Sequence, residues 1–181
     1  MHRVTACALT SVVLLACEEP PLPIPAGAFY LELRDSGADC NLITHEARVG
    51  VVGNSGSPEL VSSGAAGTEV TCSVLGDGSF DVEATIDEAP FVQITVRGLS
   101  PSATEDAPVQ GTVSYASSET GGDTFSSSSC SFWLGSDDQT VAPGKAWLSF
   151  SCDEVGSEGN VCQIFEGYLA VENCTGTVVE D

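Results

Sequence analysis

The chain alternates apolar and polar residues with a period of two over most of its length, and this pattern constrains the fold more than any other feature. In segment 28–34 (AFYLELR), Phe29, Leu31 and Leu33 share one face. Such alternation is typical of a β-strand with one buried face. Segment 79–86 (SFDVEATI) has the same pattern. No stretch combines the helical period of 3.6 with capping residues. The sequence therefore predicts an all-β chain.

Short segments of this kind recur along the chain and are separated by Gly, Ser, Asp and Pro. They are 28–34, 47–53, 69–74, 79–86, 91–97, 109–115, 129–134, 145–152 and 161–171. Gly76-Asp77-Gly78 is a typical hairpin turn. About nine short strands predict an antiparallel β-sandwich, with a β-barrel as the alternative. Segments 54–67 and 117–129, which are rich in Ser and Gly, are expected to be long loops.

Six of the eight cysteines lie beyond the N-terminal segment. They are Cys40, Cys72, Cys130, Cys152, Cys162 and Cys174. An even number favours three disulfides if the chain is exported to an oxidising compartment. A metal site is disfavoured because there is no Cys-x-x-Cys pair and His45 is the only histidine after the N-terminal segment.

One bridge follows from strand register. If 129–134 pairs with 145–152 around a turn near Val141, Cys130 lies opposite Cys152 and Phe132 lies opposite Phe150. The other four cysteines would then pair as Cys40 with Cys72 and Cys162 with Cys174. A different arrangement joins Cys152 to Cys162.

The N-terminal segment 1–16 has the form of a signal peptide. A basic start precedes an apolar run over 4–16, which is shorter than the roughly 20 residues needed to span a bilayer. The run ends in Leu14-Leu15-Ala16-Cys17, which resembles the lipobox of bacterial lipoproteins. The resemblance implies lipid on Cys17 and cleavage after Ala16. An ordinary secretory signal is the alternative.

The resemblance to lipoproteins also carries expectations about anchoring and sorting. Several acyl chains hold a protein essentially permanently at a membrane. Glu18 follows the cysteine where an Asp would retain the protein at the inner membrane, so an outer-membrane location is expected. Segment 17–27 is rich in proline and predicts a tether, followed by a single domain over 28–181. Segment 130–174 resembles acidic, cysteine-containing lipoproteins of myxobacteria, whose function is unknown.

The charge of the chain excludes some classes of partner. Only 5 basic residues stand against 26 acidic ones, giving a formal net charge of −21. Such a chain repels phosphate backbones and anionic lipid headgroups, so nucleic acid is not an expected partner. The membrane is expected to be reached through the lipid anchor. The charge leaves an envelope protein or a polysaccharide open as a partner.

No catalytic motif or cofactor motif stands out. There is no Gly-x-Ser-x-Gly element to pair with His45, and paired carboxylates are too numerous to be informative. Asp77, Asp81 and Asp137-Asp138 are the side chains that would favour calcium, although they do not match a calcium loop. We therefore expect no enzyme activity and no cofactor.

Two tryptophans are the best candidates for a binding face. Trp133 and Trp147 alternate away from the predicted core, so they either lie beneath a second layer or form an exposed platform for a sugar ring or a partner. The sequence thus predicts a lipid-anchored, non-enzymatic binding or structural module of the cell envelope. The alternatives are a small envelope-polymer hydrolase using paired carboxylates and a calcium-dependent adhesion module.

Overall fold

The computed structural model describes residues 22–35 and 39–176, and within these ranges it contains strands, turns and loops but no helix. This confirms the all-β prediction. Residues 14–17, including Cys17, lie outside the described residues. The strands are β1 Ala26–Asp35, β2 His45–Val49, β3 Val61–Ser62, β4 Glu69–Gly76, β5 Phe80–Asp87, β6 Phe91–Leu99, β7 Val109–Ala116, β8 Phe125–Trp133, β9 Thr140–Ala142, β10 Lys145–Ser157 and β11 Asn160–Glu172.

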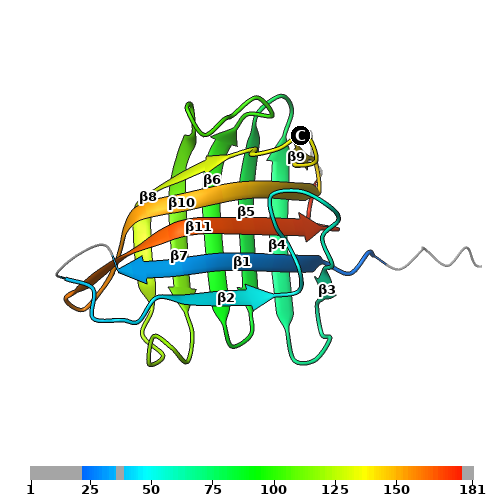
Figure 1. Ribbon diagram of the computed structural model, residues 1–181. Helices are drawn as coiled ribbons and strands as arrows, with labels where there is room; N and C mark the ends of the chain where they lie inside the picture. The colour runs from blue at the N-terminus through cyan, green and yellow to red at the C-terminus, as the bar shows by residue number, and fades with distance from the viewer. Residues whose placement is uncertain (1–21, 36–38, 177–181) are drawn as a thin grey trace, which may run out of the picture.

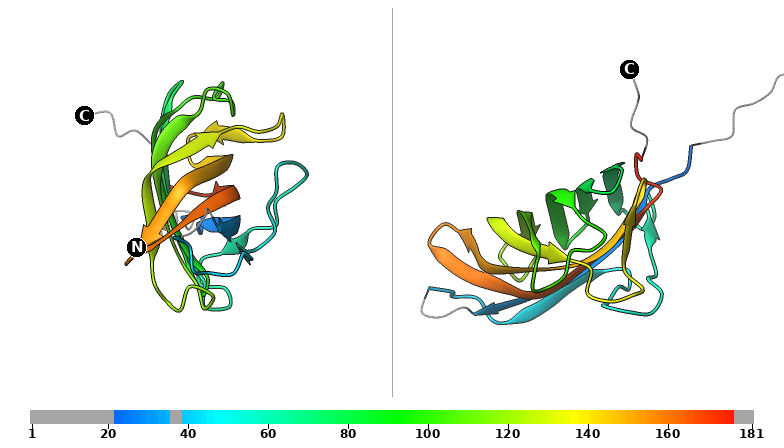
Figure 2. Two further views of the ribbon diagram at one scale, coloured as in Figure 1. Left: turned by 60° about the vertical axis from the view of Figure 1, so that its left-hand side comes forward. Right: turned by 90° about the horizontal axis from the view of Figure 1, so that it is seen from above.

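The strands form one continuous, curled antiparallel sheet. Its order is β2-β1-β11-β10-β8-β7-β6-β5-β4, with β3 on β1 and β9 on β10. Strands β4 to β8 form one layer, and β2, β1, β11 and β10 cross in front of them (Figure 1). The views in Figure 2 show the sheet curling around the space between these layers. The two layers of the predicted sandwich are therefore halves of a single sheet, because β8 pairs with β10.

The change of direction between the layers occurs where regular pairing is interrupted. Phe132 pairs with Phe150, but between Ser151 and Gly156 strand β10 leaves β8. In the same segment the register of β10 against β11 shifts between Cys152 and Val155. Such irregularities bend a strand and increase its twist, which lets the sheet fold over itself.

The core lies between the layers and follows the predicted alternation. Leu31 and Leu33 of β1 and Val82 and Ile86 of β5 are at most 1% exposed. The rings of Phe132 and Phe150 stack with centroids 5.7 Å apart. Burying one such side chain contributes about 1.5 to 3 kcal/mol. The alternation therefore drives both strand formation and closure of the layers.

Each of the nine predicted segments overlaps a strand, but the predicted loops were too long. Strand β8 begins at Phe125, inside the predicted loop 117–129, and its serines continue the ladder with β7. Phe125 is 1% exposed and anchors this start. Strand β3 lies inside the predicted loop 54–67.

Three disulfides are formed, as predicted, and one of them has the predicted partners. Cys130 is bonded to Cys152. The pairs Cys40 with Cys72 and Cys162 with Cys174, and the rival pair Cys152 with Cys162, are wrong. The observed bridges are Cys40–Cys162 and Cys72–Cys174. Each joins strands or loops more than 100 residues apart, because β11 packs next to β1 and its end reaches β4.

The Cys72–Cys174 bridge ties the chain after β11 to the edge strand β4. Val74 N donates to Thr175 O at 2.8 Å, and Thr175 N donates to Cys72 O at 3.1 Å. Gly144 N, in the turn before β10, donates to Val74 O at 3.1 Å. These contacts define a strap, residues 174–175 with Gly144, that covers part of one sheet edge and satisfies backbone groups of β4.

The first strand begins inside the segment predicted to be a tether. Strand β1 begins at Ala26, so Ala26 and Gly27 of the predicted tether 17–27 belong to the sheet. Just before the strand, Pro25 O accepts a hydrogen bond from Ser63 N at 2.8 Å. Within residues 22–35 and 39–176, there is no helix with the length and apolar character of a membrane span.

Candidate functional site

Aromatic residues form a row on the outer face of β8, β10, β11 and β1. Ser149 of β10 pairs with Trp133 on one side and Tyr168 on the other. Tyr168 in turn pairs with Tyr30 of β1, and their rings stack with centroids 6.0 Å apart. Cross-strand neighbours share a face of the sheet, so the row follows from register alone.

A β-bulge in β11 adds the Phe165 side chain to this face, next to Glu166. Glu32 pairs with Glu166 and Leu33 pairs with Ile164, which leaves Phe165 as an extra residue. Consecutive Phe165 and Glu166 are therefore both exposed, Phe165 to 52%, whereas a regular strand would bury one of them. Bulges often re-aim side chains beside functional sites.

These residues line a groove of about 270 Å³, which we call the Trp133 groove. Its walls combine aromatic rings, carboxylates and a hydroxyl, contributed by Glu105, Trp133, Ser151, Phe165, Glu166 and Tyr168. Glu105 comes from the loop between β6 and β7, so the groove joins residues from both layers of the sheet. A concave site with rings and a few polar groups is suited to binding.

The groove is electronegative. The pKa of the Tyr168 phenol is raised, mainly because the ring is removed from water, then because its hydroxyl donates to Glu166, and further because of the Glu105 charge. The pKa of Tyr30 is also raised, by burial first and then by the charges of Glu46, Glu32 and Glu166. Both phenols stay protonated at neutral pH and act as hydrogen-bond donors.

One wall of the groove already holds a cation. The guanidinium carbon of Arg34 lies 3.4 Å from the centroid of the Phe165 ring. Arg34 also donates to both carboxylate oxygens of Glu32, from Nε at 2.6 Å and from Nη2 at 2.8 Å. This hydrogen bond raises the pKa of the Arg34 guanidinium. The arrangement is a two-point clamp, in which a ring stacks on a guanidinium and a carboxylate fixes it.

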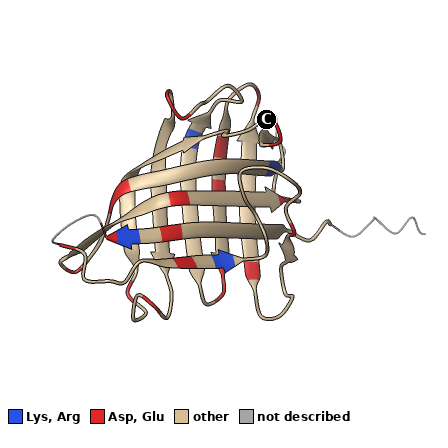
Figure 3. Ribbon diagram, in the orientation of Figure 1, with Lys and Arg blue, Asp and Glu red and all other residues tan. Residues whose placement is uncertain are grey.

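Three carboxylates line up beside the rings. Glu32 of β1 pairs with Glu166 on one side and with Glu46 of β2 on the other. Acidic positions on β11, β1 and β2 form a column in Figure 3. Like charges directly opposite each other destabilise a sheet. Arg34 offsets part of that repulsion at Glu32, and the remaining negative charge faces solvent.

The second predicted tryptophan lies on the same face of β10 but is covered. Trp147 is 8% exposed, and its indole Nε1 donates to Gly53 O at 2.9 Å. It therefore lies beneath the loop after β2, which corresponds to the covered alternative and removes Trp147 from the binding face. Asn54 of the same loop helps to line the Trp133 groove.

Buried Gln139 fixes the floor of the Trp133 groove. Its Oε1 accepts from Gly135 N at 2.7 Å, and its Nε2 donates to Ser149 Oγ at 2.9 Å. Gln139 is 5% exposed, so these bonds are shielded from water. Among the described residues, no buried side-chain nitrogen or oxygen lacks a hydrogen-bond partner. The groove is thus built on a rigid support.

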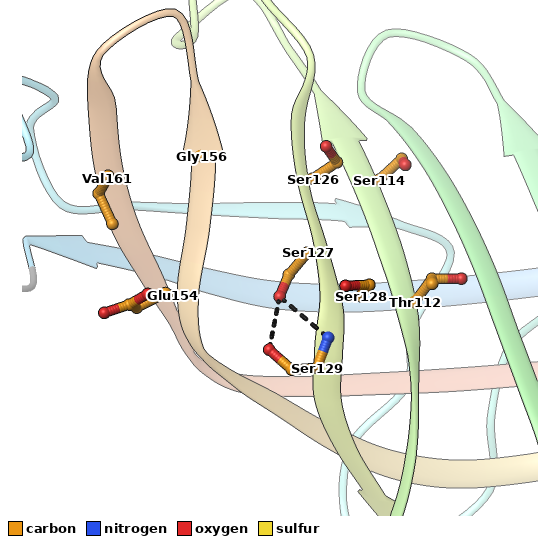
Figure 4. Close-up of a pocket in the computed structure, with 9 residues that line it drawn as sticks. All are labelled: Thr112, Ser114, Ser126, Ser127, Ser128, Ser129, Glu154, Gly156 and Val161. Atoms are coloured by element: carbon orange, nitrogen blue, oxygen red, sulfur yellow. Dashed lines mark hydrogen bonds between the residues drawn. The ribbon is translucent and has the colours of Figure 1, made fainter.

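A second, larger pocket lies where β10 leaves β8 (Figure 4). It has a volume of about 490 Å³ and is lined mainly by hydroxyls, with Glu154 as its carboxylate. Ser127 and Ser129 contact each other there, with their Oγ atoms 3.4 Å apart. It has no aromatic lining residue. We name it the serine pocket, defined by Thr112, Ser114, Ser126, Ser127, Ser128, Ser129, Glu154, Gly156 and Val161.

The other predicted candidates have structural contacts. His45 Nε2 lies 3.0 Å from Tyr115 Oη, which links β2 to β7 across the core. Asp81 accepts a hydrogen bond from Gly98 N at 2.9 Å, and Asp138 accepts one from Gly56 N at 3.1 Å. Within the described ranges, no three His, Cys, Asp or Glu side chains are grouped to hold a metal ion.

Comparisons with known proteins found no matching family model, no matching curated protein and no matching solved structure.

Proposed function

We propose that this protein is a lipid-anchored, non-enzymatic binding module of the bacterial cell envelope that holds its ligand in the Trp133 groove. One observation carries the proposal: Trp133, Phe165 and Tyr168 meet two carboxylates in one groove on a rigid sheet. Rings supply contact area at low entropic cost, and the carboxylates supply orientation. The bulge at Phe165 exists at the expense of regular pairing, which supports a role for the exposed ring.

The proposed compartment rests on the sequence and on the bridges. The segment Leu14-Leu15-Ala16-Cys17 resembles a lipobox, and three disulfides favour an oxidising environment such as the periplasm or cell surface. Glu18 favours the outer membrane. In this proposal the lipid on Cys17 provides the membrane contact, and the acidic domain faces away from anionic headgroups.

Site-specific photocrosslinking in living cells tests the binding role. A photoreactive phenylalanine analogue replaces Phe165, which is 52% exposed in the groove, or Gln93, which is exposed on β6 in the other layer. We expect a discrete crosslinked species from the Phe165 position that disappears in a Trp133→Ala background. Equal crosslinking from both positions, or none from either, would contradict a specific binding groove.

A small hydrolase acting on envelope polymers is a second candidate, because Glu105 and Glu166 line the same groove. Two carboxylates flanking a bond are the usual requirement for glycoside hydrolysis. This candidate predicts product release from purified envelope polymer, abolished by Glu105→Gln or Glu166→Gln. The binding module predicts retention of the ligand without product.

A further inference from the structure

The contacts of Arg34 show which group this surface binds within the chain itself. A guanidinium stacks on Phe165 at 3.4 Å while Glu32 binds it through two hydrogen bonds. The Trp133 groove, which Phe165 also lines, offers the same two kinds of group, namely the Trp133 and Tyr168 rings and the Glu105 and Glu166 carboxylates. None of its lining residues is basic. Because Arg34 already occupies Phe165, the components of a clamp that have no cation are the Trp133 and Tyr168 rings with the Glu105 and Glu166 carboxylates.

We propose that the Trp133 groove binds the guanidinium group of an arginine in an exposed basic segment of a protein partner. This inference rests on the proposed binding function and names its ligand. The net charge of −21 attracts a basic segment, and Glu105 and Glu166 focus that attraction at the groove. A cation over an aromatic ring gains further stabilisation when it is partly removed from water.

The geometry selects arginine over lysine. A guanidinium is planar, so it stacks on a ring while its N–H groups meet a carboxylate in two places. An ammonium is a compact and strongly hydrated charge that cannot form both contacts in the same way. The volume of about 270 Å³ accommodates a side chain and not a folded element, which favours an extended segment of the partner.

A neutral saccharide fits the groove less well. Its hydroxyls can donate to Glu105 and Glu166, but they gain no charge–charge attraction, whereas a cation gains Coulomb energy from both carboxylates as well as their hydrogen bonds. The serine pocket would suit hydroxyl-rich ligands better, but it has no ring for stacking. The electronegative field at Tyr168 is consistent with a cationic ligand.

Peptide titrations of the full-length protein in detergent micelles test the proposal. The probe is a fluorescent five-residue peptide with two arginines, compared with its lysine and citrulline counterparts by anisotropy. Citrulline has nearly the shape of arginine but no charge. We expect saturable binding of the arginine peptide, several-fold weaker binding of the lysine peptide, and no binding of the citrulline peptide.

Variants locate the site and separate it from diffuse attraction. Trp133→Ala and Glu166→Gln should each weaken arginine-peptide binding about tenfold, as expected for loss of a stacking or carboxylate contact. Glu83→Gln, exposed on β5 in the other layer, removes the same charge and should leave binding nearly unchanged. Glu105→Gln, in an exposed loop, gives a second test should Trp133→Ala fail to fold.

Two results would overturn the inference. Equal weakening by Glu83→Gln and Glu166→Gln would mean attraction by overall charge only. Trp133-dependent binding of a neutral oligosaccharide, together with no binding of the arginine peptide, would refute the arginine ligand and leave the binding groove intact. Specific crosslinking at Phe165 in cells without peptide binding would have the same meaning.

Discussion

Removal of the Cys72–Cys174 bridge, by Cys72→Ala with Cys174→Ala, should destabilise the sheet more than removal of the Cys130–Cys152 bridge. The two cysteines are 102 residues apart, but Cys40–Cys162 shortens the loop that their bond closes. With that bridge intact, the shortest path runs through 40–72 and 162–174, about 45 residues, and closing such a loop stabilises the fold by about 4 kcal/mol. The Cys130–Cys152 loop of 22 residues gives about 3 kcal/mol.

Removal of the bridge should change both the free energy of unfolding and the exchange of the amides in the strap. The strap holds β4 through Val74 and Thr175, whose backbone bonds are 2.8 and 3.1 Å long. Urea unfolding followed by tryptophan fluorescence measures the free energy of unfolding. Amide hydrogen exchange at Val74, Gly144 and Thr175 measures local opening of the strap. We expect a loss of about 4 kcal/mol and faster exchange at these amides. A loss below about 1 kcal/mol, with exchange unchanged, would refute the reasoning.

Three further changes have definite expected outcomes. Gly167→Ala places a Cβ 2.3 Å from Phe150 Cζ and should cost about 1 to 3 kcal/mol in urea unfolding; no change would mean that the ring moves aside freely. Burial raises the pKa of Tyr115 to about 12, so the native phenol stays neutral while the unfolded one ionises above pH 10. Tyr115 should contribute a fall in stability of roughly 2 kcal/mol between pH 10 and 12, and this part of the fall should be absent in Tyr115→Phe. Cys17→Ser should abolish labelling by radioactive palmitate and release the protein from membranes; continued labelling would contradict the anchor.

The strands were predictable because alternation is a local property. Phe29, Leu31 and Leu33 indicate their strand without reference to the rest of the fold. The Cys130–Cys152 bridge was predictable for a similar reason, since its partners lie on neighbouring strands with a readable register. Where the alternation is weak, as in the serines that follow Phe125, the strand was mistaken for a loop.

The remaining bridges depend on topology. Cys40–Cys162 requires β11 to pack beside β1, and Cys72–Cys174 requires the end of β11 to reach β4. No pattern within a single segment encodes those neighbours. For the same reason the sequence did not distinguish one curled sheet from a two-sheet sandwich. The two differ in whether β8 pairs with β10.

The groove was only half predictable. Trp133 was identified by its position away from the core, but the cover over Trp147 comes from a loop more than 90 residues earlier. The bulge is visible in the burial pattern of the structure, in which the buried positions Cys162 and Ile164 change phase to Gly167 and Leu169, but Phe165 and Gly167 hide it in the sequence. A shift of one residue in the alternation marks an inserted residue, whose neighbour then faces the same side of the sheet.

The most direct test of a ligand-binding groove uses the two tryptophans as an internal comparison. In protein labelled with ¹⁵N at the indoles, Trp133 and Trp147 give two N–H signals, one from the groove and one from the bond to Gly53. Titration with the arginine peptide should shift the Trp133 signal in a saturable way and leave the Trp147 signal in place. Equal shifts of both signals, or no shift of Trp133, would contradict binding in the groove.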